Sequence, residues 1–378
     1  MAALSYARSA GLPVVARSGG HCLAGRSSTT GVVVDVSPMR QVTVESGFAT
    51  VGAGVRLGAL YDELARHEVT LPAGCGPTVG VAGLVLGGGI GLLGRAYGLT
   101  CDRLQAAQVV LADGRIVDCS EEADADLFWA LRGAGGGQFG IVTSFVFETV
   151  PAPVTNGFDL RWGYADGAAL VAAWQDWAPD APDALTAVLR ITTSEVMVMG
   201  ALLGDRAEAE SLLVGLVARA GVEPGDAAYK TVPYRELKRS LAHSEEPVLA
   251  INRSEFFRRS IPADAIAELL RMLPDRAELA FTPMGGAYNR VPSGATAFAH
   301  RQERFLLEHI APDEAGDLWM NRSWETVHPY ASGRVYPNFP DPALTDWASA
   351  YHGDNYERLK RIKRAYDPDR ILTFPQSL

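Results

Sequence analysis

The 378-residue sequence has few cysteines, no excess of basic residues and no uninterrupted hydrophobic run of membrane-spanning length. Its four cysteines, Cys22, Cys75, Cys101 and Cys119, form no CxxC pair and no zinc-type cluster, so we expect neither a metal site nor a disulfide scaffold. The net charge of −10 argues against nucleic acid as the main partner. Because basic amphipathic runs are also missing, we expect no membrane partner.

The rest of the composition is that of an ordinary globular chain. Hydrophobic residues make up 48% and charged residues 21%, which separates the chain from disordered proteins, and its length favours two domains. The first residues lack a charged segment followed by an apolar one. No signal peptide is therefore visible, and we expect a cytoplasmic protein, with secretion as the alternative if the N-terminus is incomplete.

What the sequence has in abundance is glycine, above all in residues 71–104, where ten glycines are interspersed with apolar residues. This is too much glycine for an ordinary core element and too apolar for a flexible linker. Two interpretations follow: tight turns between packed strands, or a backbone whose N–H groups approach a ligand closely. No Gly-Lys-Ser/Thr follows, and no strand-then-acidic-residue frame surrounds the stretch, so a P-loop and a Rossmann fingerprint both fit poorly.

A second glycine loop, Arg17-Ser18-Gly19-Gly20-His21, follows a short apolar strand. A strand that ends in Ser-Gly-Gly suits an anion-binding nest of backbone amides, and Arg17 adds positive charge. The ring of His21 would lie beside whatever this loop binds.

Periodicity and turn residues predict an α+β chain. Expected helices cover residues 3–10, 56–67, 124–131, 206–219 and 262–273, the last with Pro262 in its first position. Expected strands cover residues 12–16, 32–36, 42–44, 49–52, 141–148, 279–282, 295–299 and 305–309, of which 32–36 should be buried on both faces. Antiparallel strand pairs are expected at residues 107–119, around Asp113-Gly114, and at 186–202. Pro151 and Pro153 indicate a domain boundary, beyond which we expect an antiparallel sheet covered by helices on one side.

Four separated motifs occur together in one order. They are Arg17-Ser18-Gly19-Gly20-His21; residues 74–102 with Thr78-Val79-Gly80 and Gly87-Gly88-Gly89; Asp126 to Gly133 through Gly140-Ile141-Val142; and Tyr336-x-Asn338 with Asn355-Tyr356 and Tyr366-Asp367-Pro368. As a set they resemble the berberine-bridge-enzyme-like FAD-linked oxidases, which belong to the vanillyl-alcohol-oxidase and p-cresol-methylhydroxylase group of flavoproteins. The resemblance covers most of the chain.

This resemblance implies a two-domain flavoprotein. The p-cresol-methylhydroxylase-type FAD-binding domain would comprise residues 1–153 and 331–378, and a substrate-binding domain would comprise residues 154–330. Family members also carry a strand and a helix before the position of Met1, so the N-terminal unit is expected to be incomplete. The FAD-binding residues that the resemblance implies are Arg17, Ser18, Gly19, Gly20, His21, Cys75, Gly76, Pro77, Thr78, Val79, Gly80, Gly83, Gly87, Gly88, Gly91, Tyr97, Gly98, Asp102, Gly140, Ile141, Val142, Tyr336 and Asn338.

His21 matches the histidine that the family joins covalently to the flavin 8α-methyl group, and a neutral imidazole is a suitable nucleophile. For a histidine after a glycine loop, a hydrogen-bonding role is the alternative. Many members also link a cysteine directly before the Pro-Thr-Val-Gly segment to the flavin. Here Gly76 holds that position and Cys75 lies one residue earlier, which on an extended backbone turns the side chain to the other face. Cys75 is therefore a candidate second link or a small buried apolar residue.

Tyr336 matches the first aromatic residue of the family's Tyr-x-Asn loop and is the expected catalytic base or orienting hydroxyl, with plain packing as the alternative. Phe339 replaces a frequent second tyrosine, and His300, His328 and Tyr288 are lesser candidates. The expected function is an oxidase that passes electrons from a small molecule to O₂ and produces H₂O₂. A dehydrogenase with another acceptor and a non-catalytic flavin-binding scaffold are the alternatives. Sugars, polyphenols, alkaloids and polyketide intermediates all remain open as substrates.

Overall fold

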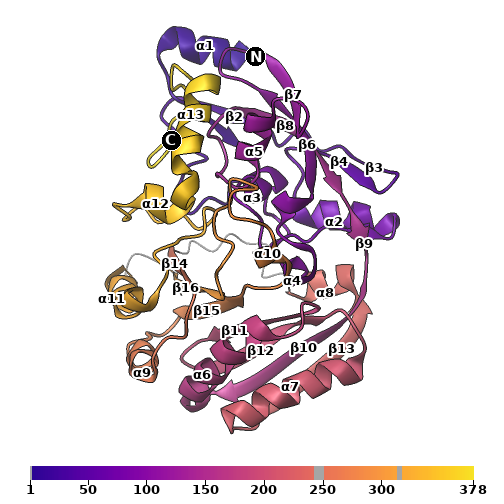
Figure 1. The fold of residues 1–378 in the computed structure, drawn as a ribbon, viewed down its shortest axis with the longest axis vertical. Helices are drawn as coiled ribbons and strands as arrows, with labels where there is room; N and C mark the ends of the chain where they lie inside the picture. Colours follow the sequence, from indigo (N-terminus) through magenta and orange to yellow (C-terminus); the bar gives the residue numbers. More distant parts are fainter. Residues whose placement is uncertain (1, 242–250, 313–316) are drawn as a thin grey trace.

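The computed structural model describes residues 2–241, 251–312 and 317–378. It has two main sheets, one of five strands and one of seven, with helices packed against them (Figure 1). The predicted α+β class is confirmed. Among the described residues, the helices are all too short or too polar to cross a bilayer.

The five-stranded sheet is antiparallel and has the order β3-β4-β8-β6-β7. Its strands are β3 (Val42–Glu45), β4 (Phe48–Gly52), β6 (Leu104–Val110), β7 (Ile116–Ser120) and β8 (Ile141–Glu148). The predicted hairpin around Asp113-Gly114 is confirmed as β6 and β7, and Gly114 takes the positive φ of +90° that this turn needs.

Helices and short strands complete this half of the molecule. They are α1 (Ala2–Ala10), α2 (Leu57–Arg66), α5 (Ala125–Leu131), β1 (Val14–Arg17), β2 (Val32–Asp35), β5 (Val69–Thr70) and β9 (Val150–Pro151). The expectation that residues 32–36 are buried on both faces is wrong for this strand. Among the strands that the structure describes, β2 pairs with β1 alone, in parallel; its three valines are half-buried and Asp35 is exposed.

The C-terminal segment returns to the N-terminal half. It contains α12 (Trp347–His352) and α13 (Tyr356–Tyr366), and α13 lies beside α5 in Figure 1. Leu359 and Ile362 of α13 join the same hydrophobic core as Leu4 of α1. Val14 at the start of β1 donates its backbone N–H to the Ile371 carbonyl at 3.1 Å, which ties the tail to the first strand.

The seven-stranded sheet is antiparallel, with the order β13-β10-β12-β11-β15-β16-β14. Its strands are β10 (Val154–Gly163), β11 (Leu185–Ile191), β12 (Glu195–Leu202), β13 (Asp226–Pro233), β14 (Ile251–Phe257), β15 (Glu278–Pro283) and β16 (Phe305–Ala311). Helices α6 (Gly167–Trp177), α7 (Arg206–Ala220), α9 (Ala263–Arg271) and α11 (Asp317–Val327) pack on one face (Figure 1). The predicted one-sided covering of an antiparallel sheet is confirmed.

Side chains of this sheet alternate between two environments because successive residues of a strand point to opposite faces. Along β11, Ala187, Leu189 and Ile191 enter the core beneath the helices. The intervening Thr186, Val188 and Arg190 face the opposite way and line a large cavity. The face opposite these four helices, against which α8 (Tyr234–Leu241) packs at β10 and β13, is therefore one wall of that cavity.

Two predictions in this part of the chain need correction. Residues 295–299 form no strand, because their backbone bonds go to the end of α5: Ala297 N–H donates to Trp129 and Phe298 N–H to Arg132. Pro262 is the N-cap of α9 and not its first helical residue. Further helices in the described residues are α3 (Val81–Leu86), α4 (Gly94–Tyr97), α8 (Tyr234–Leu241) and α10 (Ala287–Arg290), together with short 3₁₀ turns.

Candidate functional site

The glycine-rich residues 71–104 fold as loops around two short helices, α3 (Val81–Leu86) and α4 (Gly94–Tyr97). With the Ser18–His21 loop and the loop of Gly135, Gly136 and Gly137, they form one wall of a cavity of about 910 Å³. The face of the seven-stranded sheet that lies opposite α6, α7, α9 and α11 forms the other wall. Predicted site residues that line the cavity are Ser18, Gly19, Gly20, His21, Cys75, Gly76, Val79, Gly80, Gly83, Gly91, Gly140, Val142, Tyr336 and Asn338.

The two main glycine segments touch each other. A Cβ atom on Gly19 would lie 2.2 Å from the backbone nitrogen of Gly80, so only glycine allows this approach. The hydroxyl of Ser18 donates to the Ala53 carbonyl at 2.7 Å, and Gly135 N–H donates to the Leu86 carbonyl at 2.8 Å. Three loops far apart in sequence therefore form one continuous backbone surface.

The first of these loops offers free donors to the cavity. Within the described chain, the backbone N–H groups of Gly19, Gly20, His21 and Cys22 donate to no protein acceptor. Gly20 has a φ of +75°, which turns successive amides toward one side. Such a row of unpaired amides suits an anion, which is the role that the sequence analysis expects for this loop.

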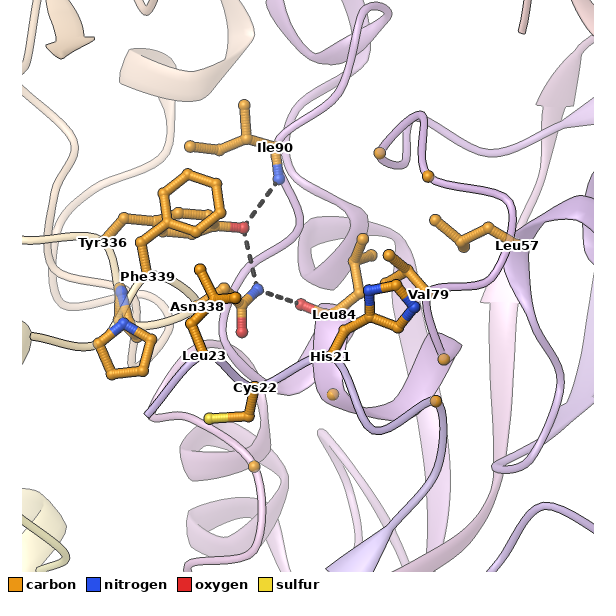
Figure 2. A pocket seen from close by; sticks show the side chains of 18 of the residues that line it. His21, Cys22, Leu23, Leu57, Val79, Leu84, Ile90, Tyr336, Asn338 and Phe339 are labelled. Atoms are coloured by element: carbon orange, nitrogen blue, oxygen red, sulfur yellow. Dashed lines mark hydrogen bonds between the residues drawn. The ribbon is translucent and has the colours of Figure 1, made fainter. Parts of the chain in front are cut away.

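His21 follows this nest directly and lies on the cavity wall near Val79 and Leu84 (Figure 2). Partial burial, and then the charge of Arg56, lower the pKa of His21 below its ordinary value. The imidazole is therefore neutral near pH 7, which is the form that acts as a nucleophile or a hydrogen-bond partner.

Cys75 also lines the cavity, next to the buried side chain of Lys238. The ammonium group of Lys238 lies 3.5 Å from the Cys75 sulfur and donates to the carbonyls of Ala73 and Gly74 at 2.7 and 2.6 Å. Burial lowers the pKa of Lys238. At the neighbouring Gly76, a Cβ would meet Val79 at 2.9 Å, so a side chain there would require Val79 to move.

Tyr336 and Asn338 connect the C-terminal segment to the glycine wall. The Tyr336 hydroxyl oxygen accepts a hydrogen bond from the Gly89 N–H group at 3.0 Å. It also accepts from the Ile90 N–H group at 3.1 Å and from the Asn338 amide at 3.0 Å (Figure 2). Asn338 also donates to the Leu84 carbonyl at 2.9 Å. Burial raises the pKa of Tyr336 to about 12. Of the two predicted roles, this geometry favours an orienting hydroxyl over a base.

Other predicted site residues lie behind the cavity wall. These are Arg17, Pro77, Thr78, Gly87, Gly88, Tyr97, Gly98, Asp102 and Ile141. Asp102 forms a buried two-point ion pair with Arg301 at 2.6 and 2.9 Å and accepts the Leu99 N–H. It therefore holds the end of the glycine-rich stretch in place. Arg17 bonds the Ser27 carbonyl and the Ser28 hydroxyl, which shapes the loop after the nest.

The lesser candidates also lie outside the cavity lining. The Tyr288 hydroxyl bonds both the N–H and the carbonyl of Gly91, so it supports the wall from behind. His300 is buried between the rings of Phe256 and Phe298, and burial lowers its pKa to about 3. His328 bonds Glu255 at 2.8 Å.

Sequence reasoning missed the two acidic residues of the sheet that line the cavity, Glu278 of β15 and Glu308 of β16. Glu308 lies on the same strand face as Leu306 and Ile310, and all three line the cavity. Burial, and then the neighbouring Glu278, raise the pKa of Glu308 to about 8. Glu278 is itself paired with Arg190 at 2.5 and 2.7 Å. Glu308 alternates with apolar residues on one face of a strand, with Leu306 before it and Ile310 after it. This charged residue at an otherwise apolar face was the signal that could have identified it.

Comparisons with known proteins show which family the chain resembles. A family model described as "FAD binding domain" matches residues 1–120, and one described as "Berberine and berberine like" matches residues 335–378. The Bacillus subtilis (strain 168) FAD-linked oxidoreductase YgaK is 35% identical over 399 residues, covering 100% of this chain and 88% of the relative.

Solved structures give the same result. The Physcomitrella patens BBE-like 1 structure matches with a TM-score of 0.94 and 28% identity, covering 99% of this chain and 88% of the other. The xylooligosaccharide oxidase of Myceliophthora thermophila C1, solved with xylobiose, matches with a TM-score of 0.90 and 26% identity over the same shares. The protein is thus an FAD-dependent oxidoreductase. The chain belongs to the berberine-bridge-enzyme-like family of FAD-linked oxidases.

The residues present fit FAD. The free amides of the nest suit a diphosphate, and the glycine wall leaves room for a flat ring system. The open space beside the glycine-rich wall is evident at Gly83 of α3, which lines the cavity. A Cβ added there would meet no protein atom within 4 Å. A side chain at position 83 would therefore enter the space available to the cofactor.

Replacing Gly83 by leucine should leave the fold intact and prevent FAD from binding. Leucine is a better helix former than glycine by roughly 1 kcal/mol, so the apoprotein should be as stable as the wild type or more so. We expect the purified variant to be colourless, as measured by flavin absorbance, with an unchanged or higher melting temperature. Gly215→Leu is the matched control, since Gly215 lies in α7 with equally open surroundings outside the cavity. A fully flavinylated Gly83→Leu protein would contradict this assignment.

Proposed function

We propose that this enzyme is an oxidase that oxidises an alcohol, a sugar or a secondary metabolite with FAD bound covalently through His21, and that it passes the electrons to O₂ to form H₂O₂. The observation that carries the proposal is one cavity with a glycine and amide wall on one side and an ionisable wall on the other. FAD, when bound, accepts the hydride equivalent of such an oxidation and is reoxidised by O₂.

The chain's own groups supply the proton chemistry. Oxidation of an alcohol to a carbonyl releases a hydroxyl proton together with the hydride. Glu308 lies on the substrate-facing wall and, in its ionised form, would accept that proton. The Asn252 amide, 3.5 Å from the Glu308 carboxylate, and the pair of Arg190 with Glu278 surround this position. Tyr336 would hold the glycine-rich wall in position, because its hydroxyl oxygen accepts hydrogen bonds from two backbone N–H groups of that wall.

The proposal also assigns the two binding functions to two domains of the chain. Residues 1–153 and 331–378 would form the FAD-binding domain, and residues 154–330 would form the substrate-binding domain. The cavity walls support this division, because the glycine segments, Tyr336 and Asn338 come from the first set and Arg190 and Glu278 from the second.

A dehydrogenase with a different electron acceptor is the second candidate. One solved relative, 25% identical and with a TM-score of 0.90, is a single-residue variant of berberine bridge enzyme that is described as a reticuline dehydrogenase. The same fold therefore supports this activity. Reoxidation of substrate-reduced enzyme by air, compared with reoxidation by a dye, separates the two candidates.

Replacing His21 by alanine should abolish the covalent flavin bond. The wild type is expected to give a fluorescent band after denaturing electrophoresis, because a covalent flavin stays with the unfolded chain. The His21→Ala protein should give no fluorescent band while still binding FAD in its folded state. Cys75→Ser is the control and should keep the fluorescence. A fluorescent His21→Ala band that disappears in the His21→Ala/Cys75→Ser double variant would assign the bond to Cys75 instead.

A further inference from the structure

We propose that Arg26 is a diphosphate-binding residue of the cofactor cavity. Arg26 lies five positions after His21, in a part of the chain that none of the sequence motifs includes. It lines the same cavity as the amide nest, as does its neighbour Ser27. The inference rests on the binding of FAD that underlies the proposed function.

The guanidinium group of Arg26 is held in a fixed orientation. It lies 5.3 Å from the ring centroids of both Tyr351 and Phe374. One of its terminal nitrogens donates to the side-chain oxygen of Gln376 at 2.6 Å. That oxygen also accepts from Tyr351, and the Gln376 amide donates to the carbonyls of Asp341 and Leu344. The Gln376 side chain that holds the Arg26 guanidinium is therefore itself fixed by hydrogen bonds.

The same loop is shaped so that Arg26 faces the cavity. Gly25, with a φ of +68°, donates its N–H to the Cys22 carbonyl at 3.0 Å. Arg17 bonds Ser27 and Ser28 from the other side. The turn that presents the free amides of residues 19–22 thus continues directly into the arginine.

Arg26 has no counter-ion in the described part of the chain, where no carboxylate lies within ion-pair distance of it. The other cavity-lining arginines, Arg190 and Arg276, belong to the sheet side, and Arg190 is paired with Glu278. A half-buried guanidinium with unused N–H groups, lining the same cavity as the free amides of residues 19–22, has the donors that a diphosphate requires. In a chain of net charge −10, such a local cation also offsets the repulsion of an anionic cofactor.

The test compares ligands with and without phosphate. Full-length proteins carrying His21→Ala, so that no covalent bond forms through this residue, are prepared as apoproteins from riboflavin-limited cells. Dissociation constants for FAD and riboflavin are then measured by flavin fluorescence. Arg26→Met should weaken FAD binding by about 10- to 100-fold, as expected for a lost charge-assisted hydrogen bond, and riboflavin binding by less than about threefold. Arg26→Lys should give an intermediate loss for FAD.

The control is Arg358→Met. Arg358 also stacks on an aromatic ring, that of Trp129 at 4.0 Å, but it lies outside the cavity lining. Both ligands should bind this variant as they bind the parent. A second measurement avoids the His21 substitution. ADP should raise the melting temperature of the His21-containing apoprotein more than adenosine does, and Arg26→Met should reduce that difference.

The outcomes separate the proposals. Equal weakening of FAD and riboflavin would mean that Arg26 only clamps the C-terminal segment, and this would overturn the inference while leaving the oxidase proposal intact. Unchanged FAD binding, or an ADP effect of the same size in Arg26→Met as in the parent, would overturn it as well. If neither flavin binds the parent or the His21-containing apoprotein, both the inference and the proposed function fail.

Discussion

Replacing Glu308 by glutamine should lower kcat by about 10²- to 10⁴-fold, the range associated with loss of a general base. Glutamine has nearly the same shape as glutamate but cannot accept the proton that leaves the substrate. The substrate KM should change much less, because the amide still fills the same position on the sheet wall. The measurement is steady-state turnover with any alcohol or sugar that reduces the wild-type flavin. A variant within about threefold of the wild type would exclude Glu308 as the base.

The pH profile supplies an independent check of the same group. Since burial raises the pKa of Glu308 to about 8 and the base acts in its ionised form, kcat should fall about tenfold per pH unit below pH 8 and level off above it. Glu255→Gln is the matched control. Glu255 is also buried, with its pKa raised to about 9, but it lies on the neighbouring strand and bonds His328 away from the cavity. Its substitution should leave the profile unchanged.

Replacing Arg95 by methionine should destabilise the protein by about 3–5 kcal/mol, the cost typical of removing one partner from a buried charged network. Arg95 of α4 is fully buried. It donates to the carbonyls of Leu185, Pro179 and Ala181 at 2.9, 3.0 and 2.5 Å, and to that of Met284. Methionine fills much of the same volume but leaves these acceptors without a partner.

The effect of Arg95→Met is measured by urea and thermal unfolding of the flavin-loaded protein. Arg206→Met is the control, because Arg206 forms an exposed pair with Glu210 within α7, and such pairs contribute less than about 1 kcal/mol. We expect the Arg95 variant also to lose flavin at lower temperature, since Arg95 joins the glycine wall to the sheet side. Stability within about 1 kcal/mol of the wild type would show that these carbonyls find other donors.

Local signals in the sequence predicted the elements that depend on local chemistry. The helix expected at residues 206–219 is α7 with nearly the same bounds, because Asp205 caps its N-terminus through the Glu208 N–H and Gly221 ends it with a φ of +69°. The hairpin at Asp113-Gly114 depends on turn chemistry in the same way. Such elements carry their own start and stop signals.

Elements that depend on distant partners were harder to predict. Residues 295–299 look like a strand, but the packing of Phe298 against Gly133 places them on the end of α5, where their N–H groups find acceptors. The nest at Gly19 and Gly20 was predicted from its motif, whereas its contact with Gly80 needed the fold. Glu308 carries a readable signal, a charge inside an apolar strand, but only the topology shows which wall its side chain reaches.

Side chains along the strands of the seven-stranded sheet alternate between the cavity and the core, and this alternation affects how the enzyme could change its preference among small molecules. Thr186, Val188 and Ala280 line the cavity, while their neighbours in sequence enter the core beneath the helices. Exchanges at every second position would therefore remodel recognition without disturbing the core beneath. Homologous enzymes could acquire new specificities along these strands by single-codon steps, and a laboratory library confined to the same positions would sample them with little loss of foldability.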